Sequence, residues 1–237
     1  MIDRSLNYGR HLVDSFLRAS GPCDAILDIG AGHGDDLLLA RAAHPGARLV
    51  GLEAYPPYVK HLKSLGVEVH SIDIERDAFP FAPESLDVAM ANQILEHTKE
   101  VFWIFDQLSR SVKVGGHLII GVPNLAALHN RILLALGRQP SPLKNNSAHV
   151  RGFTKRDLLQ LMESGFPGGY RLRGFGGSNF YPLPPLLARP LASAFPAMAW
   201  GIFLRLQKTK PYDGGFLRYP IEQKLETNFF VGPTVGG

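Results

Sequence analysis

The chain has 237 residues, of which 45% are apolar, 19% charged and 10% aromatic, with a net charge of +4. This length suits one large domain or two small ones, and the composition excludes a disordered chain and, with Cys23 as its one cysteine, a disulfide scaffold. We expect a cytoplasmic protein with no signal peptide, no stable membrane insertion and no nucleic-acid partner, because apolar runs are short and the basic excess is mild.

The first elements along the chain predict a ligand loop between a strand and a helix. Residues 3–19 have helical spacing, residues 25–30 form an apolar strand, and residues 35–43 form the next helix. The connecting loop reads Asp28-x-Gly30-x-Gly32-x-Gly34. Glycines allow positive φ and a close ligand, and the helix N-terminus offers free N–H groups. The loop lacks the spacing of dinucleotide enzymes and the lysine of a P-loop, and the acid at Asp28 suits a cationic ligand.

Strands and helices alternate over the following hundred residues. Further strands are expected at 48–53, 67–73, 86–92 and 117–123, with helices near 57–65 and 101–112. The second and third strands end in the acids Glu53 and Asp73. This alternation is typical of a parallel sheet with helices on both faces, and an acid at the tip of the second strand can accept both hydroxyls of a ribose.

The stretch from Asp28 to Asn124 resembles the class I S-adenosylmethionine-dependent methyltransferases, in particular the small-molecule branch that includes ubiquinone-pathway O-methyltransferases. The resemblance rests on the glycine loop, the two strand-end acids, and the blocks Asn92-Gln93-Ile94-Leu95-Glu96-His97 and Gly115–Asn124. It implies a Rossmann-like, seven-stranded, mostly parallel sheet with an antiparallel last strand. It also implies S-adenosylmethionine as methyl donor and S-adenosylhomocysteine as product.

The resemblance assigns a role to each position that matches it. The methionine part of the cofactor would lie on the glycine loop, the ribose on the Glu53 carboxylate, and the adenine beside Asp73 and Ile74, while Asn92 would face the transferred methyl. The implied cofactor-binding residues are Asp28, Gly30, Ala31, Gly32, Gly34, Glu53, Ala54, Asp73, Ile74 and Asn92.

His97 is the candidate general base, because it follows the fourth strand where an acceptor should enter, and a histidine titrates near neutral pH. The alternative is that it only packs or hydrogen-bonds at the start of a helix. Glu96 is expected to be structural. No metal is expected, because the nine histidines show no acid-flanked ligand pattern.

The second half of the sequence contains the residues that we expect to contact the acceptor. Helices are expected at 125–136 and 155–164, a sixth strand at 170–175, and a seventh, antiparallel strand at 200–208. His149, Arg151 and Tyr181 are candidate substrate contacts; for His149 and Arg151, ordering of the loop is an equal alternative. The proline-rich segment 176–199 is interpreted first as a cap over an apolar acceptor, then as packing on the sheet, and last as a membrane-surface contact.

These observations predict a methyltransferase domain at 1–208 and an aromatic C-terminal extension at 209–237 that packs on it or forms a homodimer. We expect methylation of a small molecule, most readily at oxygen. The lack of an Asn/Asp-Pro-Pro-Tyr/Phe block after the fourth strand argues against base amino groups in nucleic acids. A lipid or glycan precursor as acceptor, and a non-catalytic cofactor-binding regulator, stay open as alternatives.

Overall fold

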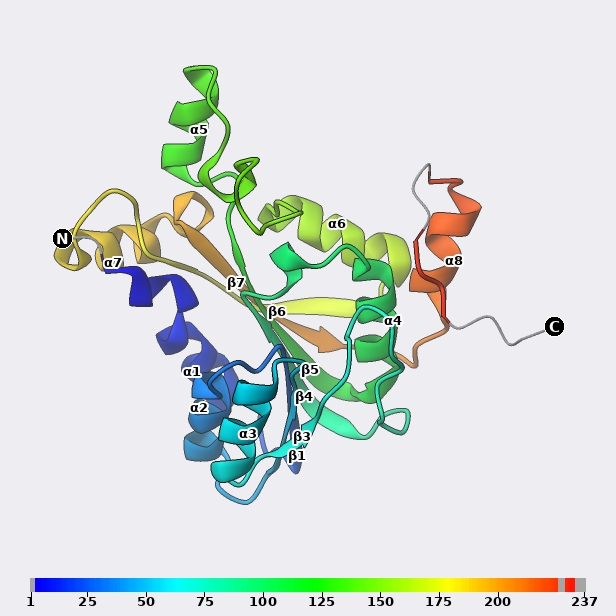
Figure 1. Ribbon diagram of the computed structural model, residues 1–237. Helices are drawn as coiled ribbons and strands as arrows, with labels where there is room; N and C mark the ends of the chain where they lie inside the picture. Colours follow the sequence, from blue (N-terminus) through cyan, green and yellow to red (C-terminus); the bar gives the residue numbers. More distant parts are fainter. Residues whose placement is uncertain (1–2, 226–228, 233–237) are drawn as a thin grey trace.

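One seven-stranded sheet forms the centre of the computed structural model, which describes residues 3–225 and 229–232 (Figure 1). The strand order is β3-β2-β1-β4-β5-β7-β6. The strands are β1 (Ala25–Ile29), β2 (Arg48–Leu52), β3 (Glu68–His70), β4 (Leu86–Asn92), β5 (Val112–Pro123), β6 (Tyr170–Ser178) and β7 (Gly201–Lys208). β7 is antiparallel to both neighbours, and the other pairs are parallel. The predicted Rossmann-like sheet is confirmed.

Helices cover both faces of this sheet (Figure 1). One face carries α1 (Arg10–Arg18), α2 (Asp35–Ala43) and α3 (Pro56–Ser64), and the other carries α4 (Val101–Ser111), α6 (Lys155–Gly165) and α8 (Gly215–Glu222). Successive side chains of a strand point to opposite faces. Ile26 of β1 therefore joins the core beneath α1–α3, and Leu27 joins the core beneath α4, α6 and α8.

The remaining helices lie at the edges of the layered core. α5 (Leu128–Ala135) projects away from the sheet, and α7 (Pro185–Ala194) lies beyond the end of β6 (Figure 1). Over the described residues, four short 3-10 helices accompany these elements: η1 (Arg4–Tyr8), η2 (Leu95–His97), η3 (Ser141–Leu143) and η4 (Pro196–Met198). None of the helices in the described part of the chain has the length and apolar character needed to cross a membrane.

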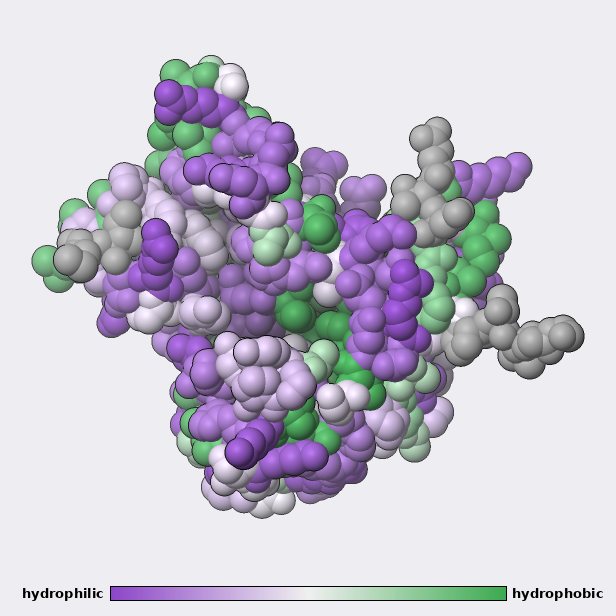
Figure 2. Space-filling model, viewed as in Figure 1, coloured by the Kyte–Doolittle hydropathy of each residue, from purple (hydrophilic) through white to green (hydrophobic). Residues whose placement is uncertain are grey.

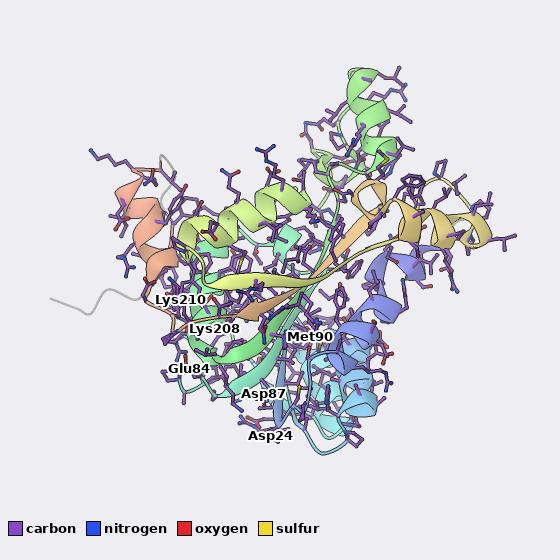
Figure 3. The ribbon with its side chains drawn as sticks, turned by 180° about the vertical axis from the view of Figure 1, so that it is seen from behind. Asp24, Glu84, Asp87, Met90, Lys208 and Lys210 are labelled. Carbon is purple, nitrogen blue, oxygen red and sulfur yellow. The ribbon has the colours of Figure 1, made fainter. Side chains whose placement is uncertain are left out.

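Charged groups close the amino edge of the parallel strands (Figure 3). The buried Lys208 donates to the Glu84 carboxylate at 3.2 Å and to the Val112 carbonyl at 2.8 Å. Asp87 accepts from the backbone N–H groups of Asp24 and Ala25 at 2.8 and 2.9 Å. These side chains satisfy one another and the strand ends, so this edge is structural and the opposite, carboxyl edge is available for a ligand.

The N-terminal helix differs from the prediction of a single helix over 3–19. Gly9 separates η1 from α1 in a left-handed conformation, with φ +52°. A side chain at Gly9 would also collide with the Phe203 ring, so the chain can bend here only because the residue is glycine. The bend brings η1 beside the carboxyl edge of the sheet.

Several other boundaries differ from those expected. β3 ends at His70, three residues early, and β5 begins at Val112, five residues early. β6 continues to Ser178, which pairs with Gly201, so the first three residues of the expected cap at 176–199 belong to the sheet. The glycines at 176 and 177 allow this, because Leu12 and Ala199 pack where their side chains would be.

The described part of the C-terminal extension packs on its own domain. Phe216 of α8 is fully buried and stacks on Phe105 of α4, with ring centroids 5.5 Å apart. The Tyr212 hydroxyl donates to Asp106 at 2.8 Å and accepts from the Phe216 N–H at 2.9 Å. Residues 1–2 of the expected domain, and 226–228 and 233–237 of the expected extension, lie outside the described residues.

Candidate functional site

A cavity of about 200 Å³ lies at the carboxyl ends of β1 and β4. Its lining comes from the N-terminal segment, the glycine loop, α2, α3 and the end of β4: Tyr8, Arg10, Asp28, Gly30, Ala31, Gly32, His33, Asp35, Asp36, Tyr58, Asn92 and Gln93. The cavity thus contains most of the predicted glycine loop and two predicted polar residues, Asp28 and Asn92.

The glycine loop presents bare backbone to this cavity. Gly30, Gly32 and Gly34 have φ values of +64°, +52° and +80°. A side chain at Gly30 would lie 2.6 Å from Ile94, whereas one at Gly32 would meet just a carbonyl oxygen, 3.9 Å away, among the residues that the structure describes. Glycine at 30 is therefore required by the protein itself, and the space at 32 is open to a ligand.

Two carboxyl groups are buried beside the loop, and among the described residues the one cation paired with them is Arg10, which lies beside Asp36. Asp28 is 4% exposed and Asp36 is 9% exposed. Burial raises the pKa of Asp28 well above its usual value, and the negative charges of Asp36 and Glu53 raise it further. Burial likewise raises the pKa of Asp36, although an Asn92 hydrogen bond and the Arg10 guanidinium, 3.8 Å away, oppose this. An ammonium or sulfonium ligand would compensate these charges.

Glu53 ties the tip of β2 to the glycine loop. One carboxylate oxygen accepts from the Gly32 N–H and the other from the Tyr55 N–H, both at 2.8 Å. The side chain is thereby held at the edge where a parallel sheet of this kind binds ribose. Ala54 and Tyr55 follow it on the exposed surface.

The predicted adenine contacts lie farther out. Asp73 is exposed, accepts from the Glu75 N–H at 2.9 Å and, through its own N–H, donates to Asp77 at 2.8 Å. Ile74 packs against the core on the α4 side. Among the described residues, neither contributes to the lining of the 200 Å³ cavity, so their roles stay predictions.

Asn92 and Gln93 form the floor at the end of β4. The Asn92 amide donates to Asp36 at 2.7 Å and to the Tyr8 carbonyl at 3.0 Å, which joins β4, α2 and η1. Gln93 has a φ of +56°, which is strained for a side chain of this kind. Its N–H donates to the Gly121 carbonyl at 2.7 Å, and that bond holds the turn in place.

The predicted base His97 lies in η2 beside a buried acid and a second histidine. Its Nδ1 is 3.3 Å from the Ala148 carbonyl, and its ring is 4.7 Å from that of His149. Glu96 is 1% exposed, and burial raises its pKa to about 8. Burial and the neighbouring His97 lower the pKa of His149, which favours its neutral form.

The predicted substrate residues separate into two groups. His149 and Tyr181 line a second cavity of about 270 Å³, together with Asn7 and Trp200. Asn7 is the neighbour of Tyr8, so the N-terminal segment borders both cavities. Arg151 instead donates to the Lys99 carbonyl at 2.7 Å and orders the loop. Their contacts with a substrate stay predictions.

The sequence analysis missed several residues of the first cavity. Asp36 had a signal, since an acid in the first turn after a glycine loop is well placed to face the ligand. Tyr8 and Arg10 had none, because only the bend at Gly9 brings the N-terminal segment to this edge.

Comparisons with known proteins agree with this geometry. A family model described as a methyltransferase domain matches residues 27–120. A Mycolicibacterium smegmatis protein described as a probable S-adenosylmethionine-dependent methyltransferase is 27% identical over 135 residues, which are 57% of this chain and 48% of that protein. The chain spans only 32% and 48% of the lengths of the curated relatives that it matches.

Solved structures share the fold at low identity. A methyltransferase from Archaeoglobus fulgidus, described as dependent on S-adenosylmethionine, has a TM-score of 0.57 at 18% identity, covering 84% of this chain and 94% of its own. A protein described as the [4+2]-cyclase SpnF has a TM-score of 0.60 at 16% identity, covering 86% and 81%. The same fold therefore occurs in proteins described by different activities.

Proposed function

We propose that this chain, which carries a class I S-adenosylmethionine-dependent methyltransferase domain, transfers the cofactor's methyl group to a small-molecule acceptor. The observation that carries the proposal is the pair of buried acids, Asp28 and Asp36, beside the open backbone of Gly32. A ligand that is cationic at one end and bears a ribose at the other fits these acids and Glu53.

The residues present fit that cofactor. Asp28 and Asp36 would attract its ammonium and sulfonium charges, and Glu53 would accept the ribose hydroxyls. When bound, the cofactor supplies an electrophilic methyl carbon, which an acceptor lone pair attacks in line as the carbon–sulfur bond breaks. Asn92, held by two hydrogen bonds, fixes the end of β4 at which the acceptor must be aligned.

We place the acceptor in the second cavity, lined by His149, Tyr181 and Trp200, with an oxygen atom as the preferred methyl acceptor. Polar groups at this cavity can orient a hydroxyl, and the aromatic rings can pack on an apolar body. The role of His97 as proton acceptor remains a prediction. We also propose residues 1–208 as the catalytic domain, with the remaining residues as an extension packed on it.

A second acceptor class, an amphiphilic anionic lipid precursor, is favoured by a separate cavity of about 460 Å³. Leu159 and Ile202 contribute apolar lining, and Arg131, Lys155 and Arg156 line the same cavity. An apolar cavity that also presents three cations suits a molecule with a hydrocarbon part and a phosphate or carboxylate.

The test is to incubate the protein with methyl-labelled S-adenosylmethionine and a panel of phenols, hydroxy acids and lipid phosphates, and to measure S-adenosylhomocysteine by mass spectrometry. Product with at least one class is expected, and the Asp28→Asn variant should lose it while Asp14→Asn, which alters a half-buried acid on α1 outside the three cavities, should not. Cofactor binding without any product would instead favour the regulator alternative. A protein that does not bind the cofactor would contradict the proposal.

A further inference from the structure

Glu96, His97 and His149 form a cluster that the predicted methyl transfer does not by itself explain. Each offers one ligand atom, and these atoms all lie within 4.8 Å of one another. The three residues come from η2 and from the loop before α6, 52 positions apart in the sequence. Spacing along the chain therefore gave no sign of the cluster.

The backbone holds the two segments together. The N–H groups of Val150 and Arg151 both donate to the Glu96 carbonyl, at 2.8 and 3.2 Å. The Arg151 guanidinium adds its bond to the Lys99 carbonyl. The geometry of the cluster is thus fixed by hydrogen bonds that do not involve the three side chains.

The Glu96 side chain is buried and incompletely hydrogen-bonded. It is 1% exposed, and one of its carboxylate oxygens is buried with no hydrogen-bond partner among the described residues. Among the described residues, the ion pairs of Arg76 and Lys99 are formed with Glu100 and not with Glu96. A buried carboxyl in this state is costly unless a cation accompanies it.

The histidines present the complementary donors. Nδ1 of His149 is buried and has no partner among the described side chains and backbone groups. His97 turns its Nδ1 toward the Ala148 carbonyl, which leaves Nε2 as a lone-pair donor. A ring N–H bound to a backbone carbonyl is the usual arrangement behind a metal-binding histidine.

We propose that Glu96, His97 and His149 together bind one divalent transition-metal ion at the acceptor side of the site. Two imidazoles and one carboxylate suit zinc, cobalt or ferrous ions better than magnesium or calcium, which prefer oxygen ligands. Two ligand atoms that each lie about 2.0–2.2 Å from one ion are at most roughly 4.4 Å apart. Small side-chain rotations that move the ligand atoms by a few tenths of an ångström would therefore bring all three within bonding distance of one ion. This proposal departs from the expectation of no metal that was taken from the sequence.

The consequence for catalysis rests on the proposed function. His149 also lines the second cavity, so an acceptor hydroxyl there can reach the ion's open position. The ion would lower the pKa of that hydroxyl, whose proton passes to water while its oxygen attacks the methyl group. A nitrogen that holds the ion cannot accept a proton, so metal binding excludes the predicted base role of His97.

The test is to strip the protein with a chelator and titrate it with Co²⁺, following the visible absorption bands and the heat of binding. One ion per chain is expected, displaced by Zn²⁺, with two hyperfine-shifted imidazole N–H signals in the proton spectrum. Glu96→Gln and His149→Ala should each weaken binding at least about tenfold, whereas His61→Ala, which removes an exposed histidine of α3, should not.

The unaltered protein keeps this test decisive if a variant folds poorly. The metal site would be overturned if the unaltered protein bound no Co²⁺ or showed no imidazole signals. It would also be overturned if both ligand variants bound Co²⁺ as tightly as the unaltered protein does. Cofactor affinity, measured separately by calorimetry, distinguishes this failure from failure of the proposed function. Metal binding with no cofactor binding would refute only the latter.

Discussion

At the scale of single residues, Glu53 shows how one carboxylate can serve both the fold and a ligand. It already accepts two backbone N–H groups, and a carboxylate retains further lone pairs for two ribose hydroxyls. We expect Glu53→Gln to weaken binding of S-adenosylmethionine about 10–100-fold, since hydrogen bonds to a charged group contribute roughly 1.5–3 kcal/mol. Calorimetric titration measures this, with Asp14→Asn as control. Unchanged affinity in Glu53→Gln would remove the ribose role.

His117 gives a residue-scale prediction on pH. Burial, and then the charges of Arg205 and Arg173, lower its pKa to about 4. Below pH about 6.5 His117 is protonated in the unfolded chain but stays neutral in the folded chain. The free energy of unfolding therefore falls as the pH drops from about 6.5 to 4. Urea unfolding should show that between pH 7 and pH 5 the natural protein loses up to about 2 kcal/mol more than His117→Gln.

The comparison with the variant cancels the other titrating groups. Asp28 and Asp36 have raised pKa values and act in the opposite direction, but they are present in both proteins. An equal loss of stability in the two proteins would show that folding does not lower the pKa of His117.

The sequence predicted which residues lie together where their position follows from the order of the strands, while their roles stay predictions. Asp28, Gly32 and Asn92 lie where strand ends meet, and a parallel sheet places such ends side by side. Sequence reasoning failed for Arg10 and for the pairing of His97 with His149, because both depend on bends and loop hydrogen bonds that no local pattern records.

At the scale of elements, α8 belongs to the domain that it covers. Phe216 fills the space over Gly165, where an added side chain would collide with its ring. Phe216→Ala should lower the free energy of unfolding by about 3–5 kcal/mol, because it leaves a cavity between α4, α6 and α8. Ile221→Ala, at a 63% exposed position of the same helix, should change it by less than about 0.5 kcal/mol.

Denaturant unfolding of the two variants measures that difference. If both alanine variants had the same free energy of unfolding as the parent protein, packing of α8 would not contribute to the stability of the domain. The sequence predicted that the aromatic residues of this segment pack, but not against which helices, since partner choice depends on the tertiary arrangement.

Some boundaries of helices and strands could be predicted from the local sequence, and others depend on tertiary contacts. β1, β4 and the ends of α4 were predictable from apolar runs bounded by turns. The end of β6 was not, because Gly176 and Gly177 look like a loop locally and become strand only where Leu12 and Ala199 cover them. A glycine-rich segment can be loop or strand, and the residues that pack on it in the folded protein decide which.

At the scale of the whole molecule, charge and exposed apolar side chains coincide. Residues 124–212 contain twelve Lys and Arg but only two acids, Asp157 and Glu163. The mild net charge of the chain therefore hides this strongly basic segment. The same segment carries large exposed apolar side chains on α5, in the loop beyond it, and on α7 and its C-cap: Leu128, Ile132, Leu134, Leu136, Val150, Leu186, Leu187 and Phe195.

This distribution suggests how a lipid acceptor, the second acceptor class, could reach the protein from a membrane surface. Figure 2 shows hydrophobic residues over α5 at the top of the molecule, and α5 and α7 project at the opposite side from α8 (Figure 1). Basic residues attract an anionic lipid surface and the exposed leucines can insert shallowly into it. A lipid acceptor could then enter the apolar cavity lined by Arg131, Lys155 and Arg156 without leaving the surface.

We therefore expect the protein to float with phosphatidylglycerol vesicles at low salt and to be released as salt rises, because exposed charges are screened. The double variant Leu134→Glu, Leu136→Glu should weaken this binding about tenfold or more, since it removes apolar area and adds negative charge. Ile221→Glu, an equally exposed change on α8 at the far side, should have little effect. No flotation of the parent protein with anionic vesicles, or equal loss in Ile221→Glu, would discard the membrane surface and leave the soluble acceptor alone.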